Sequence, residues 1–136
     1  MRELAVELPG GTVRGLRWGE AGRPPVLALH GWLDNAASFV PLAAHLEGIE
    51  LVAIDLPGHG RSAHLPPGAD YSFAAAVHLV LDVADALGWE RFALLGHSMG
   101  AGISSLVAAG APERVERLLV IEALGALPEA PENTAR

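Results

Sequence analysis

The pentapeptide Gly96-His97-Ser98-Met99-Gly100 is the segment of this sequence best suited to chemistry. It follows an apolar run typical of a buried strand and precedes small apolar residues typical of a helix. A serine at such a turn presents its hydroxyl above the sheet, and the flanking glycines avoid collisions with the neighbouring strand and helix. The NH groups of the following helix stabilise negative charge. The pattern predicts a nucleophile at Ser98; the alternative is an ordinary serine-glycine turn that caps a helix.

A second segment, His30-Gly31-Trp32, ends another predicted buried strand. Gly31 permits a tight turn, and the backbone NH of Trp32 can then point toward Ser98. Acyl transfer places charge on the former carbonyl oxygen, and losing one preorganised donor typically costs ~2.7–4 kcal/mol of barrier. We therefore assign the backbone NH groups of Trp32 and Met99 as the oxyanion donors. Taken alone, this triplet is better explained as a plain strand-end turn.

The segment from Asp55 to Ser62 forms a third motif after a buried strand, punctuated by proline and glycine. We interpret it as a rigid scaffold in which Asp55 is held by neighbouring backbone or by Arg61. His59 lies in this segment and could be considered as a general base. Nothing in the spacing brings it to Ser98, so a structural histidine is the better interpretation.

Composition narrows the class of protein. The chain has 136 residues, a formal net charge of −7 and no basic cluster, which argues against nucleic acid or an anionic membrane as a partner. No apolar stretch reaches the ~20 residues that a membrane span needs, and the first thirty residues do not resemble a secretory signal. The absence of cysteine excludes disulfides, thiolate metal ligands and a cysteine nucleophile. We expect a cytoplasmic protein that takes a small, uncharged ester or acyl substrate.

Short apolar runs alternate with helix-like stretches, which predicts an α/β fold with a mostly parallel, twisted sheet flanked by helices. Residues 3–8 and 12–18 predict an antiparallel hairpin at the sheet edge, around Pro9-Gly10-Gly11. Buried strands are expected at 26–30, 50–55, 91–96 and 117–121, and helices at 36–47, 72–87 and 99–109. Ser72 and Gly88 have the residue types expected at the two ends of the middle helix.

With these motifs together, the sequence resembles the α/β-hydrolase family. Within that family it resembles the serine hydrolase-like branch and the branches that hydrolyse small esters or C–C bonds. The resemblance covers residues 1–127, interpreted as the N-terminal portion of such a domain, with 128–136 a loop or the start of a cap region. It implies a truncated α/β-hydrolase fold of about six strands, Ser98 as nucleophile, an oxyanion hole at Trp32 and Met99, and neither cofactor nor metal. It also implies a later acid and a histidine near the end of the domain.

The sequence departs from that pattern because no histidine follows Ser98; the six are His30, His45, His59, His64, His78 and His97. Without a base a serine hydroxyl is a poor nucleophile, so we expect this chain to be nearly inactive. Glu122, at the end of the last predicted strand, is a candidate acid, since some members of the family place their carboxylate there. A rim residue without a catalytic role explains it at least as well.

The same strand predicts an unpaired apolar sheet edge at residues 118–121, which needs a partner. The rest of the same protein is the simplest partner, and an oligomer is the alternative. The sequence leaves three classes of function open. The first is a serine hydrolase, which is esterase-like or else a C–C bond hydrolase or thioesterase of the same fold. The second is a pseudo-hydrolase that binds without catalysis, and the third is a nucleotide-binding domain. The last is weak, because the glycine spacing matches neither nucleotide motif.

Overall fold

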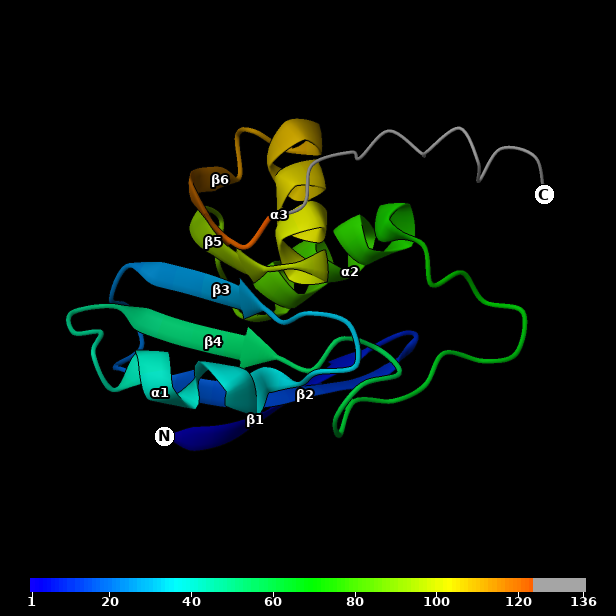
Figure 1. Ribbon diagram of the computed structural model, residues 1–136, viewed down its shortest axis with the longest axis horizontal. Helices are drawn as coiled ribbons and strands as arrows, with labels where there is room; N and C mark the ends of the chain where they lie inside the picture. Colours follow the sequence, from blue (N-terminus) through cyan, green and yellow to red (C-terminus); the bar gives the residue numbers. More distant parts are fainter. Residues whose placement is uncertain (124–136) are drawn as a thin grey trace.

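The computed structural model describes residues 1–123, which form one six-stranded sheet with helices on both faces (Figure 1). The strand order is β1-β2-β4-β3-β5-β6. The elements in chain order are β1 (Arg2–Leu8), β2 (Gly11–Trp18), β3 (Pro25–Leu29), η1 (Ala36–Phe39), α1 (Val40–Ala43), β4 (Glu50–Ile54), α2 (Phe73–Ala86), β5 (Phe92–His97), α3 (Met99–Gly110) and β6 (Val115–Ile121). The predicted α/β class is confirmed.

The N-terminal strands form the antiparallel edge that the sequence predicts. β1 pairs antiparallel with β2, with Val6 opposite Val13, and β2 pairs antiparallel with β4. The other neighbours, β4 with β3, β3 with β5, and β5 with β6, are parallel. The carboxyl ends of β3, β4, β5 and β6 therefore meet at one rim, where an open sheet of this kind places its ligand.

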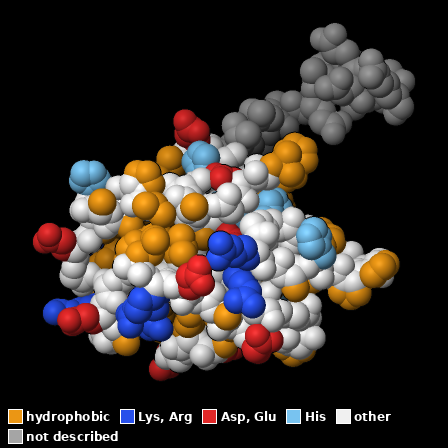
Figure 2. Space-filling view, turned by 90° about the horizontal axis from the view of Figure 1, so that it is seen from below, with side chains coloured by type: hydrophobic (Ala, Val, Ile, Leu, Met, Phe, Trp, Pro, Cys, Tyr) orange, Lys and Arg blue, Asp and Glu red, His pale blue; other side chains and the backbone are white. Residues whose placement is uncertain are grey.

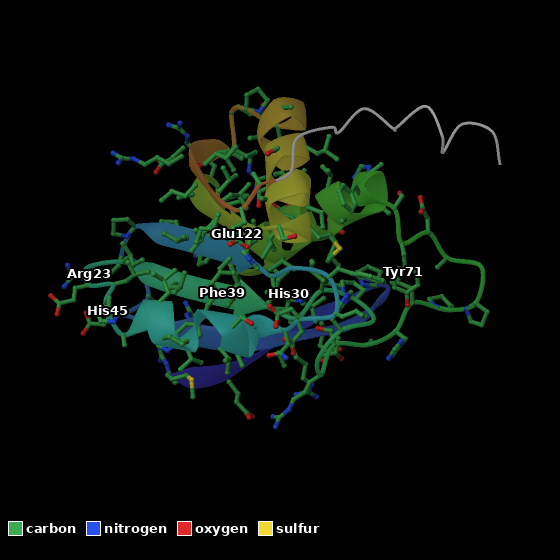
Figure 3. The ribbon with its side chains drawn as sticks, viewed as in Figure 1. Arg23, His30, Phe39, His45, Tyr71 and Glu122 are labelled. Atoms are coloured by element: carbon green, nitrogen blue, oxygen red, sulfur yellow. The ribbon has the colours of Figure 1, made fainter. Side chains whose placement is uncertain are left out.

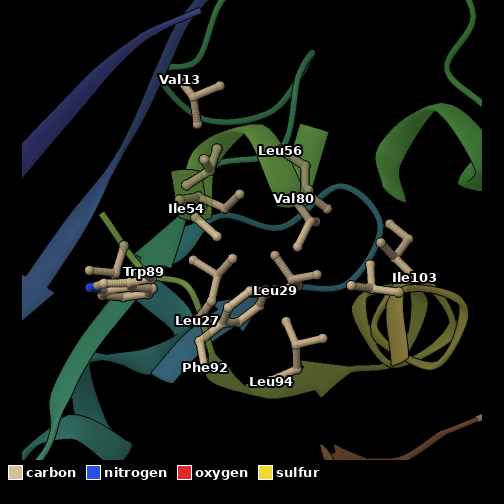
Figure 4. Packing of buried hydrophobic residues seen from close by; sticks show 14 of the residues in the cluster. Val13, Leu27, Leu29, Ile54, Leu56, Val80, Trp89, Phe92, Leu94 and Ile103 are labelled. Carbon is tan, nitrogen blue, oxygen red and sulfur yellow. The ribbon is translucent and has the colours of Figure 1, made fainter. Parts of the chain in front are cut away.

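Successive side chains of the buried strands point to opposite faces of the sheet, so the core is divided into two clusters, one on each face. Leu27 and Leu29 of β3 pack with residues of α2 and α3, whereas Ala28 packs with Phe39 and Ala43 on the opposite face. Figure 1 shows α2 and α3 on one side of the sheet and α1 on the other, and Figure 4 shows the larger cluster from close by. The two clusters fix the sheet between its helices.

Helix α2 begins and ends as its sequence predicts. The Ser72 hydroxyl accepts a hydrogen bond from the Ala75 NH at 3.2 Å, which satisfies a free donor of the first turn. Gly88, with φ of 74°, follows the last turn, where an L-residue would be strained. The side chains of Val80, Val83 and Ala84 are fully buried on the sheet side.

The first crossover helix is shorter than the predicted 36–47. It consists of η1 followed by α1, which ends at Ala43. Beyond that point the NH groups of His45 and Leu46 bond to carbonyls three residues back, and Gly48 at φ of 74° turns the chain toward β4. Phe39 and Ala43 are buried as expected, but Leu46 is exposed, so the apolar periodicity overestimated this helix by about one turn.

Strand β6 forms the other edge of the sheet and pairs with β5 in the described part of the chain. Its side chains from Leu118 to Ile121 are 40–52% exposed, so the predicted apolar edge is present. The segment expected as a loop or cap start, 128–136, lies outside the described residues.

The surface mixes charge and apolar groups. Figure 2 shows one face, on which acidic and basic side chains are interspersed around patches of apolar side chains. Among residues 1–123, no helix has both the length and the apolar character that crossing a bilayer requires.

Candidate active site

Backbone strain is concentrated at the rim where three neighbouring strands end. Within residues 1–123, the non-glycine residues with positive φ are Leu33, Ser98 and Glu122, at 58°, 53° and 51°. They follow β3, β5 and β6 respectively. Each such residue costs of order 1–3 kcal/mol and persists only where the surroundings hold it, which happens most often at functional sites. This rim is therefore the candidate active site.

Ser98 forms the tight turn between β5 and α3. Its φ and ψ are 53° and −112°, its NH donates to the carbonyl oxygen of Ile121 at 3.0 Å, and its own carbonyl accepts from the NH groups of Ala101 and Gly102. The turn is thus held from both sides, by the end of β6 and by the first turn of α3. The structure places Ser98 at the strand-to-helix turn that the sequence predicts.

The two glycines around Ser98 are required by close approach. A Cβ on Gly96 would lie 2.5 Å from the Cα of Ala101, and one on Gly100 would overlap the carbonyl oxygen of Leu29. Gly96 therefore lets α3 come close to β5, and Gly100 lets α3 come close to the end of β3. Both approaches fix the position of Ser98 on the rim.

The turn after β3 lies directly beside Ser98. A Cβ on Gly31 would lie 3.5 Å from the Cβ of Ser98 and 3.4 Å from Nδ1 of His97. The Asp34 NH closes this turn on the Gly31 carbonyl at 3.2 Å, with Leu33 in the left-handed region. Strain at Leu33 has no signal in the sequence, because leucine has no preference for positive φ.

The two backbone NH groups assigned as oxyanion donors are free. In the part of the chain that the structure describes, neither the Trp32 NH nor the Met99 NH donates to an internal acceptor. Met99 is the first residue of α3, so its NH belongs to the positive end of the helix dipole. The structure brings the segments of Trp32, Met99 and Ser98 together at one rim.

His30 is fully buried and fixes the turn through both ring nitrogens. Its Nδ1 donates to the Gly31 carbonyl at 2.7 Å, and its Nε2 accepts from the Leu56 NH at 3.0 Å. Nε2 must be unprotonated to accept this bond. Burial lowers the pKa of His30 below its ordinary value, which favours the same neutral form. His30 thus positions the ends of β3 and β4 relative to each other.

Asp55 organises the loop that follows β4. Its carboxylate accepts hydrogen bonds from the Ala36 NH at 2.7 Å and the Arg61 NH at 2.9 Å. The Arg61 guanidinium instead pairs with Glu3, so Asp55 is held by backbone groups. A Cβ on Gly60 would overlap the Asp55 carboxylate, which explains the glycine there. This loop serves as a scaffold for the rim.

Glu122 contacts His97, a relationship that the sequence did not predict. Nε2 of His97 lies 3.2 Å from Oε2 of Glu122. In the parallel register His97 lies beside Ile121, so the pair follows from the alignment of β5 with β6. Glu122 is 80% exposed, and exposed ion pairs contribute only about 0.2–1 kcal/mol. The candidate acid therefore lies at the rim, with a histidine partner.

None of the histidines has a hydrogen bond to the Ser98 side chain in the described structure. His45 lies at the opposite end of the sheet from His30 (Figure 3). His59 bonds through Nδ1 to the Pro57 carbonyl, and its ring packs at a centroid distance of 5.0 Å from that of His30. In residues 1–123, no group of three or more His, Cys, Asp or Glu side chains is placed to hold a metal ion.

A cavity of about 530 Å³ adjoins the rim. Trp32 and Met99 line one part of it, and the remaining walls come from the β1–β2 turn, the loop between β4 and α2, α2 itself, and Ile103 of α3. Ser98 itself is absent from the lining. Volumes of about 300–1,000 Å³ are typical of small-molecule sites.

Similarity to known proteins identifies the family to which this chain belongs. The family described as alpha/beta hydrolase fold matches residues 24–135. The serine hydrolase-like protein of Danio rerio is 42% identical over 127 residues, which cover 93% of this chain and 39% of that protein. A human serine hydrolase-like protein is 40% identical over 121 residues, covering 88% of this chain and 60% of its own length.

Solved structures agree with the sequence relatives. A hypothetical protein from Pseudomonas aeruginosa matches with a TM-score of 0.90 and 46% identity, over 99% of this chain and 48% of that one. A thioesterase domain from the curacin biosynthetic pathway matches with a TM-score of 0.83 and 32% identity, over 99% of this chain and 51% of that domain.

The chain belongs to the α/β-hydrolase family. Within that family it resembles the serine hydrolase-like proteins. It spans 39% of the length of the Danio rerio protein and 60% of the length of the human protein.

Proposed function

We propose that this chain carries the nucleophile and oxyanion hole of a serine hydrolase that acts on carboxylic esters or related acyl compounds. The observation that carries the proposal is the strained turn at Ser98, near which the NH groups of Met99 and Trp32 have no acceptor within residues 1–123. Strain at a serine between strand and helix is expected where its hydroxyl must be presented to a substrate.

In the proposed reaction the Ser98 oxygen attacks the substrate carbonyl carbon while a base takes the hydroxyl proton. The Trp32 and Met99 NH groups stabilise the resulting oxyanion. The tetrahedral intermediate collapses to an acyl-Ser98 ester and releases the alcohol, which takes a proton. Water then attacks the acyl ester, releases the carboxylic acid and restores the serine.

The base is the missing part of this proposal. The six histidines all precede Ser98 and form no hydrogen bond to its side chain within the described residues. We therefore propose that the 136-residue chain turns over esters at only a residual rate. Glu122 remains a candidate for the acid that would orient a base, and hydrolysis of C–C bonds or thioesters fits the same rim.

A pseudo-hydrolase that binds without catalysis is the second candidate. The lack of a base favours it, whereas the intact turn at Ser98 and the free NH groups favour the enzyme. The names of the relatives support a hydrolase without specifying its substrate, and this chain spans a part of each relative.

The test is covalent labelling of the purified chain by a fluorophosphonate, read by intact mass, with and without added imidazole as an external base. We expect labelling that is slow alone, accelerated by imidazole, and abolished by Ser98→Ala. Ser105→Ala is the matched control on the same helix, where the hydroxyl bonds only to the Ala101 carbonyl.

Each other outcome has a defined meaning. Fast labelling without imidazole would show that the chain contains its own base and would contradict the proposed low activity. No labelling of the folded chain with imidazole present would favour the pseudo-hydrolase. If Glu122→Gln leaves labelling unchanged under both conditions, this glutamate takes no part in activating Ser98 within the chain.

A further inference from the structure

The cavity beside the rim has walls that bring together segments far apart in the sequence. Tyr71 packs on Gly58, where a Cβ would lie 3.1 Å from its ring, and the Tyr71 hydroxyl accepts from the Leu65 NH at 2.7 Å. Phe73 packs on Gly102 of α3, where a Cβ would lie 2.9 Å from its ring. Gly58 thus lets Tyr71 pack within the loop between β4 and α2, and Gly102 lets Phe73 pack between α2 and α3.

The lining is apolar apart from a few groups at its edges. Its hydrophobic surface includes Leu65, Phe73, Leu79 and Ile103. On α2, Ala75 and Leu79 face the cavity one helical turn apart, whereas neighbouring Ala74 is exposed and outside the lining. Binding of a hydrocarbon chain against this apolar surface removes both from water, which is favourable.

The charges around the cavity are acidic. Asp70 and Asp82 belong to its lining together with His59 and His78, and no arginine does in the described residues. The sequence also contains no lysine. The Asp70 carboxylate accepts from both the NH and the hydroxyl of Ser72 at 2.7 Å, which holds it in the charged form. A ligand with a free carboxylate would meet repulsion without a compensating cation.

We infer that this cavity binds the neutral, apolar acyl chain of the substrate and discriminates against acyl chains that end in a negative charge. The inference rests on the proposed function for the position of the carbonyl group, at the NH groups of Trp32 and Met99, two residues that line the cavity. The acyl part remains attached to Ser98 after the alcohol leaves, so it is the part that needs a binding surface through both steps.

Binding is tested without chemistry, in the Ser98→Ala variant, by calorimetry at about pH 8, above the usual pKa of histidine. Methyl octanoate and sodium octanoate share one hydrocarbon chain and differ in charge, and methyl acetate has the same ester group without the chain. We expect saturable binding of methyl octanoate, at least about tenfold weaker binding of octanoate, and no saturable binding of methyl acetate.

Two variants of α2 locate the site. Ala75→Phe places a ring in the cavity and is expected to weaken methyl octanoate binding by about tenfold or more. Ala74→Phe adds the same ring on the exposed side of the helix and is expected to leave binding unchanged. Leu119→Glu on β6 tests the competing apolar surface and is also expected to leave binding unchanged.

An independent measurement covers the case in which Ala75→Phe does not fold. Titration of methyl octanoate into the Ser98→Ala variant, in which Ala75 is kept, is expected to shift the methyl NMR signals of Leu79 and Ile103. Equal affinity for octanoate and its methyl ester, or no shift at these methyls, would overturn the inference. Binding without Ser98 labelling would instead overturn the proposed function and leave the cavity assignment standing.

Discussion

Gly100 lies against the end of β3 so closely that a Cβ would overlap the carbonyl oxygen of Leu29 and lie 2.7 Å from that of His30. Both obstacles are backbone atoms, at and just after the end of a central strand, so they cannot move aside as a flexible side chain would. We predict that Gly100→Ala lowers the free energy of unfolding by about 2 kcal/mol or more, measured by urea denaturation.

Gly110→Ala is the matched control in the same helix. Gly110 ends α3, and a Cβ there meets nothing within 4 Å. Because alanine favours helix over glycine, stability should be unchanged or up to about 1 kcal/mol higher. Equal effects of the two substitutions would show that helix propensity, and not the contact with β3, decides the result at Gly100.

Asp55 accepts two backbone hydrogen bonds, a buried one from Ala36 and a partly buried one from Arg61. Asp55→Ala leaves both donors without a partner, and each such loss costs about 1–3 kcal/mol. We predict a total loss of about 2–6 kcal/mol in thermal or urea unfolding. Asp55→Asn should lose less, since one acceptor oxygen remains.

Asp82→Ala provides the comparison for Asp55. Asp82 is exposed on α2 and has no hydrogen bond in the described structure, so its replacement should change stability by no more than about 0.5 kcal/mol. A loss at Asp55→Ala that matches this small value would contradict the scaffold role of the carboxylate.

His30 should make stability depend on pH. Because burial holds its pKa in the folded chain below the ordinary value of about 6.5, the unfolded chain binds more protons as the pH falls through that value. The free energy of unfolding should therefore decrease between about pH 7.5 and pH 5, by at most about 1.4 kcal/mol per pH unit from this group.

Replacement of His30 isolates this contribution. His30→Gln keeps an acceptor for the Leu56 NH and should flatten the pH dependence, whereas His45→Gln at an exposed site should not. Asp34 and Asp70 stay charged in this window, because hydrogen bonds from Ser38 and Ser72 respectively lower their pKa values. An unchanged slope in His30→Gln would refute the assignment.

The apolar edge at β6 should promote self-association of the 136-residue chain. Leu118, Leu119, Val120 and Ile121 are all substantially exposed on a strand whose outer edge is unpaired in the described structure. Sedimentation velocity should show association that rises with concentration and that Leu119→Glu weakens by about tenfold or more. Leu46→Glu, at an exposed site away from this strand, should leave it unchanged.

Much of the fold follows from short-range patterns. The apolar runs at β3, β4, β5 and β6, the hairpin at Pro9-Gly10-Gly11, and the ends of α2 at Ser72 and Gly88 all depend on residues within a few positions of one another. The first crossover helix was mispredicted because its apolar periodicity continues to Leu46, although the chain leaves the helix after Ala43. Periodicity records which residues can be buried, and packing decides where the helix ends.

The sequence alone determined the family, the position of Ser98 at a strand-to-helix turn, and the lack of a histidine after it, because each is a matter of residue type and local spacing. Only the tertiary structure decided that His97 meets Glu122, that His30 joins Gly31 to Leu56, and that the β1–β2 turn, the loop after β4, α2 and α3 line one cavity with Trp32 and Met99. These contacts depend on the order and register of the strands. Strand order brings together residues far apart in the chain, and no local pattern encodes the distance between them.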